Sequence, residues 1–119
     1  DKYNLQEKVT LVGYKKNPYA WISQANAFVL SSYYEGFPNV VLEALSCGTP
    51  VISTPAPGGT KEILESIEGC HLSKEISASS LQEVIFNFTS SKFQRIDPSA
   101  IESYKPEKIC EKYTQVFLS

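Results

Sequence analysis

The sequence predicts an α/β fold, a Rossmann-like, doubly wound parallel sheet of about four strands with flanking helices. Three observations favour it. Short apolar runs alternate with longer segments whose apolar residues recur at helical spacing, as in strands and helices that follow one another in a parallel sheet. The runs are almost continuously apolar, which is typical of strands buried on both faces. Glycine or proline stands at most of the boundaries.

Four of these runs are predicted to be strands, because they are apolar or β-branched and are bounded by turn residues. Gly13 ends the first, and Gly69 leads into the last. The predicted strands are residues 9–13 (VTLVG), 27–32 (AFVLSS), 50–54 (PVIST) and 70–73 (CHLS).

The remaining segments are predicted to be helices. Asn17 caps the first, with Pro18 in its first turn. The second begins at Pro38 and ends at Gly48, since helices often end at a left-handed glycine, and a third covers residues 60–66. Two further helices each carry one apolar stripe that is expected to be buried. The stripes are Leu81, Val84, Ile85 and Phe88, and then Ile109, Tyr113, Val116 and Phe117 after Pro106.

The stretch EGFPNVVLEA, residues 35–44, is the candidate functional segment. It follows the predicted strand 27–32, so its turn lies at the carboxyl end of a strand, where open α/β sheets bind ligands. Gly36 removes a side chain and lets a ligand approach the backbone. Pro38 suits the first helical position, where its missing amide hydrogen would have had no partner.

The first turn of this helix predicts an anion site. The amides of Asn39, Val40 and Val41 have no partner inside the helix, and the helix dipole reinforces them. Glu35 and Glu43 flank this turn, and each carboxylate can accept hydrogen bonds from a pair of hydroxyls. An anion between two hydroxyl-bearing ends describes a nucleoside diphosphate sugar. The alternative is a common strand-turn-helix whose glutamates face solvent.

The segment SSYYEGFPNVVLEALSCGTPVISTPAPGG resembles the core of the carboxyl-terminal domain of retaining GT-B glycosyltransferases of family 4, the glycosyl transferases group 1. The likeness includes the pair Glu35 and Glu43 with seven residues between them, the helix that ends in CGTPV, and Gly58-Gly59 followed by Glu62. It is strongest over residues 9–63 and looser beyond them.

This resemblance implies roles for individual residues. Glu35 would be the catalytic residue, which contacts hydroxyls of the donor sugar and stabilises charge near the anomeric carbon. Glu43 would hold the ribose hydroxyls, and the Gly58-Gly59 loop would border the cleft. The donor would be a nucleotide diphosphate sugar, expected to be UDP-linked, transferred with retention and without a metal or another cofactor. The candidate donor-binding residues are Glu35, Gly36, Phe37, Pro38, Asn39, Val40, Val41 and Glu43, with Tyr14, after the predicted strand 9–13, as a candidate for the base.

The sequence departs from the family pattern in one respect. The arginine and lysine that clamp the diphosphate in similar enzymes would precede residue 1, and Arg95 is a poor substitute for them. We therefore expect residues 1–119 to be one truncated nucleotide-sugar-binding domain that is inactive alone, with the acceptor domain and the first part of the donor domain absent. The complete enzyme would be a hexosyltransferase of polysaccharide or glycoconjugate biosynthesis, with a glycan, lipid-linked or other acceptor.

Such a truncation would leave residues 9–13 without their usual neighbours. We expect them to pair with the strand at residues 27–30 or with another chain in a homodimer, because an uncovered sheet edge favours aggregation.

Composition excludes several other classes of function. The net charge of −2 gives no basic footprint for nucleic acid. There is no apolar run of the ~18 residues that a membrane span needs, and no signal peptide opens the chain. The cysteines, Cys47, Cys70 and Cys110, are not grouped as metal ligands and fit a reduced cytoplasm. We expect a cytoplasmic protein, at most peripheral to the membrane, in which His71 is structural.

The alternative function is a non-catalytic nucleotide-sugar-binding or regulatory module with the same fold. The presence of both Glu35 and Glu43 argues against it, because a structural module has no need for the pair.

Overall fold

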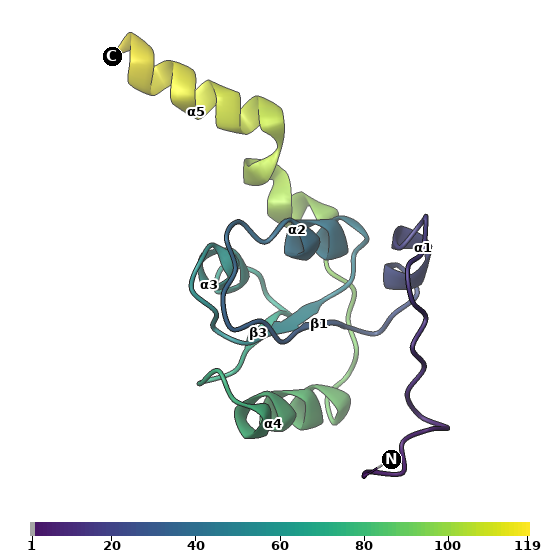
Figure 1. Cartoon of the computed structure of the whole chain (residues 1–119). Coiled ribbons are helices and arrows are strands. Elements are labelled where there is room, and N and C mark those ends of the chain that lie inside the picture. The colour runs from purple at the N-terminus through teal and green to yellow at the C-terminus, as the bar shows by residue number, and fades with distance from the viewer. Residues whose placement is uncertain (1) are drawn as a thin grey trace.

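The computed structural model describes residues 2–119, and a parallel three-stranded sheet lies at its centre (Figure 1). The strands β1 (Phe28–Leu30), β2 (Val51–Ser53) and β3 (His71–Leu72) lie side by side in that order. Val29 is opposite Ile52, and Ser53 is opposite Leu72. Three of the four predicted strands, and their parallel arrangement, are therefore confirmed.

The prediction of a strand at residues 9–13 is wrong. This segment has no regular structure and pairs with none of the three strands, so the expected pairing with β1 is also wrong. Leu11 is 95% exposed, and Figure 1 shows the amino-terminal part of the chain running outside the sheet. Strand propensity is a preference for a half-buried pleated surface, and in this chain the segment has no such surface to join. Pairing with a second chain stays a prediction.

Helices cover both faces of the sheet. Figure 1 shows α2 (Asn39–Ser46) and α3 (Thr60–Leu64) on one side and α4 (Ala78–Thr89) on the other, as in a doubly wound fold. The remaining helices are α1 (Tyr19–Ile22), the 3₁₀ helix η1 (Pro98–Tyr104), which packs on α2, and α5 (Pro106–Leu118).

The first helix begins later than predicted. Pro18, and not Asn17, is the residue before α1, and no side chain caps its first turn. The helix is a single turn without buried residues. A helix this short gains little from its own hydrogen bonds, so its cap carries little of the local stability.

The core lies between α2 and the sheet. Val41, Ala44 and Leu45 of α2 are buried against Val51 of β2. Gly48 ends α2 with a φ of 73°, as predicted for a left-handed glycine. The segment after α4 returns to this core, because Ile96 is buried and its amide donates to the carbonyl of Gly48 over 3.0 Å.

The two predicted apolar stripes have different outcomes. The stripe of α4 is half-buried against β2 and β3. The stripe of α5 is not buried, because α5 projects away from the domain (Figure 1) and Phe117 is 82% exposed. Periodicity predicts an apolar face but does not supply the surface that covers it. Within residues 2–119, no helix has the length and apolar character needed to cross a membrane.

Candidate functional site

Two loops meet at the carboxyl ends of β1 and β2. The amide of Glu35, in the loop after β1, donates to the carbonyl of Pro57 in the loop after β2 over 3.0 Å. The amide of Gly59 points back to the carbonyl of Gly36 over 3.4 Å. Between these contacts Gly58 has a φ of 115°, and a Cβ there would lie 2.0 Å from the carbonyl oxygen of Glu35. Only glycine allows so close an approach of the two backbones.

The carboxylate of Glu35 is held by a residue that lies just after β1. Its Oε1 atom accepts a hydrogen bond from the Ser32 hydroxyl, and both side chains are half-buried. The Thr54 hydroxyl, at the end of β2, donates to the carbonyl of Ser32 over 2.5 Å. Ser32 and Thr54 are not among the site residues predicted from the sequence. The signal in the sequence was the serine three residues before Glu35, since serine hydroxyls often bond within turns.

The start of α2 differs from the prediction. Pro38 precedes the helix, with φ −82° and ψ 73°, and the amide of Asn39 donates to the carbonyl of Phe37 over 2.9 Å. These values describe an inverse γ-turn centred on Pro38. The helix therefore begins at Asn39, and the prediction that places Pro38 at the first helical position is wrong.

The γ-turn and the first turn of α2 each use one of the predicted free amides. Asn39 donates to Phe37, and Val41 donates to the carbonyl of Pro38 over 3.0 Å. The prediction of three unpaired amides is wrong for these two. Within residues 2–119, the amide of Val40 donates to no backbone carbonyl. Because Asn39 and Val40 are exposed, this end of the helix is open to solvent.

Glu43 lies one turn into α2 and is half-buried. Val41, Ala44 and Leu45 face the core. Glu43 comes two residues after Val41, about 200° further round the helix at ~100° per residue. Its side chain therefore projects from the helix face opposite the core. Glu35 and Glu43 therefore lie before and after the first turn of α2.

The turn between the glutamates is open. A Cβ added to Gly36 would meet no heavy atom within 4 Å. Phe37 is exposed, although the edge of its ring packs near Gly59. The backbone between Glu35 and Pro38 is therefore accessible to a ligand.

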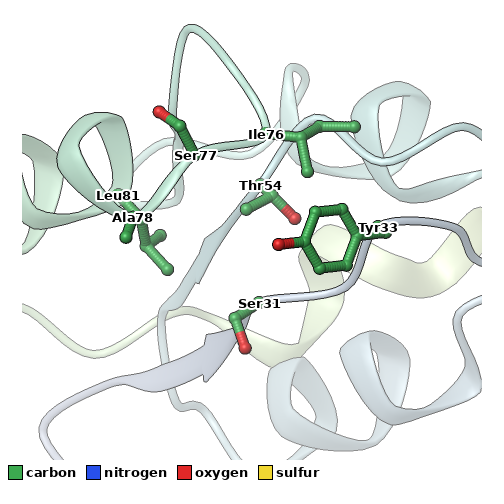
Figure 2. Close-up of a pocket in the computed structure, with 7 residues that line it drawn as sticks. All are labelled: Ser31, Tyr33, Thr54, Ile76, Ser77, Ala78 and Leu81. Carbon is green, nitrogen blue, oxygen red and sulfur yellow. The ribbon is translucent and has the colours of Figure 1, made fainter.

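A pocket of about 270 Å³ lies beside this network, at the carboxyl ends of the sheet strands and the start of α4. Figure 2 shows the Tyr33 hydroxyl pointing into it, with Thr54 at its back wall. Thr54 is thus shared between the pocket and the contacts that hold Glu35. The sequence analysis did not predict this pocket. Its lining residues are Ser31, Tyr33, Thr54, Ile76, Ser77, Ala78 and Leu81.

The family model described as glycosyl transferases group 1 matches residues 1–105 of this chain. The chain belongs to the glycosyl transferases group 1 family. The match includes the turn at Glu35, the helix α2 and the Gly58-Gly59 loop. The coarse form of the predicted identity is therefore confirmed.

Individual relatives agree with this assignment. An uncharacterised glycosyltransferase of Methanocaldococcus jannaschii is 52% identical over 64 residues, 54% of this chain and 16% of that protein. The N-acetylgalactosamine-N,N'-diacetylbacillosaminyl-diphospho-undecaprenol 4-alpha-N-acetylgalactosaminyltransferase of Campylobacter jejuni is 40% identical over 60 residues, 50% of this chain and 16% of that protein. The chain thus spans only a small part of the length of these relatives.

A solved structure supports the fold class. The sucrose-phosphate synthase from Thermosynechococcus elongatus has a TM-score of 0.70 and 29% identity, over 98% of this chain and 32% of that chain. The predicted α/β class, a Rossmann-like sheet that forms part of a GT-B glycosyltransferase, is confirmed.

Tyr14 and Arg95 lie outside the segment between Glu35 and Glu43. Tyr14 is 93% exposed in the irregular segment before α1, so the argument that it follows a strand end is wrong. The guanidinium of Arg95 donates to the Thr49 hydroxyl over 3.2 Å, at the amino end of β2. Because Glu35 lies beyond the carboxyl end of the neighbouring strand, Arg95 does not reach it.

His71 and Cys70 make packing contacts that are consistent with structural roles. The ring of His71 packs edge-on against Phe88 of α4, with centroids 5.9 Å apart. Burial raises the pKa of the Cys70 thiol, while the amide of Val51 donates to its sulfur over 3.4 Å. A raised pKa keeps a thiol protonated and unreactive. Neither residue is part of the open turn.

Proposed function

We propose that this chain is the donor-binding part of a retaining GT-B glycosyltransferase of family 4, which takes a UDP-linked sugar as donor. The observation that carries the proposal is the open turn at the start of α2, which lies between Glu35 and Glu43 at the carboxyl end of β1. Membership of the glycosyl transferases group 1 family supports it.

The proposed chemistry assigns one task to each part of the turn. Glu35 accepts hydrogen bonds from the donor sugar and stabilises positive charge near the anomeric carbon. Glu43 accepts hydrogen bonds from the ribose hydroxyls, and Gly36, Phe37 and the helix start lie along the sugar and diphosphate. The departing diphosphate gains negative charge in the transition state, so fixed donors aimed at it lower the barrier.

The start of α2 supplies only part of the required positive charge. The amide of Val40 and the helix dipole face the anion, while the amides of Asn39 and Val41 are used within the turn. We propose that basic side chains elsewhere in the polypeptide complete the diphosphate site, and that no metal is needed. Residues 1–119 are then one domain that binds the donor weakly and does not catalyse transfer alone.

The acceptor site lies in another part of the same polypeptide in this proposal. The Campylobacter relative is named for an acceptor on a diphospho-undecaprenol carrier. A glycan or lipid-linked acceptor at the cytoplasmic face of a membrane, within polysaccharide or glycoconjugate biosynthesis, is the corresponding proposal for this protein. Tyr14 keeps its proposed contact with the base only if the segment before α1 folds over the nucleotide.

Titration of UDP against the longest natural form of the polypeptide tests the proposal. Removing the Glu43 carboxylate should weaken UDP binding by about ten- to a hundredfold, because hydrogen bonds to charged groups contribute about 1.5–3 kcal/mol. The measurement is calorimetry on wild type, Glu43→Ala and the control Glu83→Ala, whose exposed carboxylate lies on α4. Glu83→Ala should bind like wild type.

The same titration separates the alternative function. A non-catalytic module of this fold would bind UDP equally with and without Glu43, or not at all. Either result would remove the assignment of Glu43 to the ribose.

A further inference from the structure

The side chain of Glu35 is oriented by one neighbour. Ser32 donates its hydroxyl hydrogen to Oε1 of Glu35. In the part of the chain that the structure describes, no other side chain donates to this carboxylate. A carboxylate can accept about four hydrogen bonds, so one oxygen is fixed by the protein and the other stays available to a ligand.

Ser32 is itself tied to the sheet. The Thr54 hydroxyl donates to the carbonyl of Ser32 over 2.5 Å, and the amide of Thr54 donates to the carbonyl of Leu30 over 3.1 Å. Thr54 is 3% exposed. The chain of contacts therefore runs from the buried end of β2, through the backbone of Ser32, to the carboxylate of Glu35.

The backbone of Glu35 is held independently. Its amide donates to the carbonyl of Pro57, and Gly58 packs against its carbonyl oxygen. The neighbouring side chains Tyr33 and Tyr34 are exposed. Without Ser32, the backbone of Glu35 would stay in place while its carboxylate would be free to change rotamer.

We infer that Ser32 is a positioning residue of the donor site, whose hydroxyl, held by Thr54 through the Ser32 backbone, fixes the Glu35 carboxylate in the orientation that meets the donor sugar. This inference rests on the proposed contact between Glu35 and the sugar. Fixing a side chain before the ligand arrives removes the entropy cost of ordering it on binding. Ser32 therefore contributes to recognition of the sugar and not of the nucleotide.

The test compares UDP with UDP-sugars, which carry the same nucleotide and differ from it by the sugar. UDP and a panel of UDP-glucose, UDP-N-acetylglucosamine and UDP-N-acetylgalactosamine are titrated against the longest natural form of the polypeptide. Ser32→Ala should weaken binding of the accepted UDP-sugar by about three- to tenfold, the cost of ordering one flexible side chain, and leave UDP binding unchanged. Ser32→Thr keeps the hydroxyl and should restore the affinity. Ser90→Ala, an exposed serine at the end of α4, should change neither affinity.

A second pair of variants shows whether Ser32 acts through Glu35. In a Glu35→Gln background, Ser32→Ala should cause little additional loss of UDP-sugar affinity, because coupled residues are not additive. Fully additive losses would overturn the inference. Equal weakening of UDP and UDP-sugar by Ser32→Ala would also overturn it, since that pattern is a general loss of structure.

The roles of Glu35 and Ser32 can be disproved separately. If Glu35→Gln leaves UDP-sugar binding unchanged, the proposed role of Glu35 is wrong, and the positioning role is wrong with it. If Glu35→Gln weakens binding and Ser32→Ala does not, only the positioning role is wrong. Binding of UDP by each variant shows that it is folded.

Discussion

Gly58 joins the two loops of the site at the scale of single residues. Its φ of 115° and the 2.0 Å separation between an added Cβ and the Glu35 carbonyl oxygen leave no room for a side chain. From the sequence, the Gly58-Gly59 loop is expected beside the donor cleft only by resemblance to the family. The structure gives the physical reason, because this contact fixes the backbone from which Glu35 projects. At Gly36, one residue after Glu35, an added Cβ would meet only open space.

These two glycines should respond differently to alanine. Gly58→Ala should lower the free energy of unfolding by more than about 1 kcal/mol, because alanine at positive φ is strained and its Cβ meets the Glu35 backbone. Gly36→Ala should leave the free energy of unfolding unchanged and weaken UDP-sugar binding. Urea denaturation measures the first quantity and calorimetry the second. Normal stability of Gly58→Ala would mean that the two loops are not in contact in solution.

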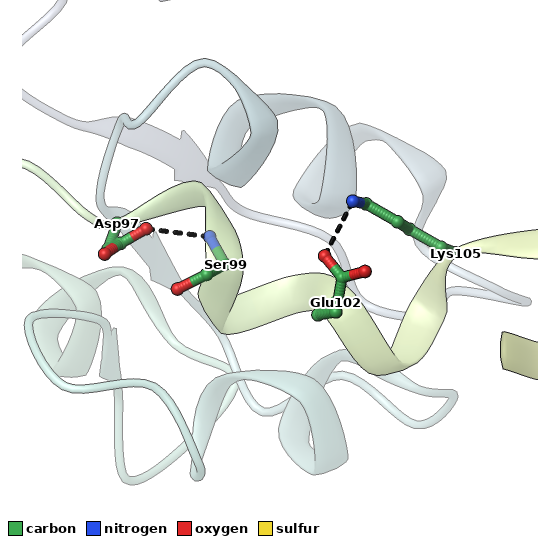
Figure 3. A network of polar contacts seen from close by, with 4 residues as sticks. All are labelled: Asp97, Ser99, Glu102 and Lys105. Carbon is green, nitrogen blue, oxygen red and sulfur yellow. Dashed lines mark hydrogen bonds and ion pairs between the residues drawn. The ribbon is translucent and has the colours of Figure 1, made fainter.

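At the scale of elements, η1 begins at a side-chain cap. Figure 3 shows Asp97 accepting a hydrogen bond from the amide of Ser99, over 2.9 Å, and Lys105 paired with Glu102 at the other end of the helix, at 2.6 Å. The amide of Ser99, followed by its hydroxyl, lowers the pKa of Asp97. The pair of Lys105 and Glu102 is exposed and contributes little. The cap lies at the start of η1, which packs against α2, and directly follows the buried Ile96.

The cap predicts a pH-dependent contribution to stability. Because the pKa of Asp97 is lower in the folded chain, its contribution is fully present above about pH 4, the unfolded value, and is lost as the pH falls through the folded value. Asp97→Ala should lower the melting temperature at pH 7 and have a smaller effect at pH 2. Asp97→Asn keeps the acceptor without the charge and should retain most of the stability at pH 7. Thermal unfolding followed by circular dichroism measures both; equal losses for the two variants would contradict a cap.

At the scale of the whole molecule, Ile96 and the helix α5 that follows it contribute unequally to stability. Ile96 is buried between Gly48 and Gly69, where a Cβ on Gly69 would lie 2.9 Å from its Cδ1 atom. Ile96 therefore brings the segment that follows α4 back into the core. The helix α5 follows it but projects into solvent, and its apolar residues Val116 and Phe117 stay exposed.

Removing α5 should therefore lower the free energy of unfolding by less than changing one residue of the core does. Ile96→Ala should destabilise the chain by about 2–4 kcal/mol, since it deletes buried methyl groups and leaves a cavity. Deletion of residues 106–119 should leave the free energy of unfolding nearly unchanged. Urea denaturation of both variants measures this. A larger loss on deletion than on Ile96→Ala would show that α5 packs on the domain in solution.

The sequence by itself determined which segments become β1, β2 and β3 and that helices alternate with them along the chain. It determined the end of α2 at Gly48 as well, because apolar period and glycine placement are local properties. It also determined where the candidate carboxylates lie, since Glu35 and Glu43 are fixed by their spacing in the turn and the helix. Residues 9–13 and α5 have the right apolar pattern, but pattern does not supply a partner surface, so the structure left both exposed.

Only the tertiary structure decided how the site is held together. The γ-turn at Pro38, which uses the amide of Asn39, and the bond from the Val41 amide to the Pro38 carbonyl depend on the path by which the chain enters α2. The contacts of Ser32 with Thr54, and of Gly58 with Glu35, join residues about 20 positions apart. Such contacts arise because parallel strands bring their carboxyl ends to one edge of the sheet, and no local sequence pattern encodes them.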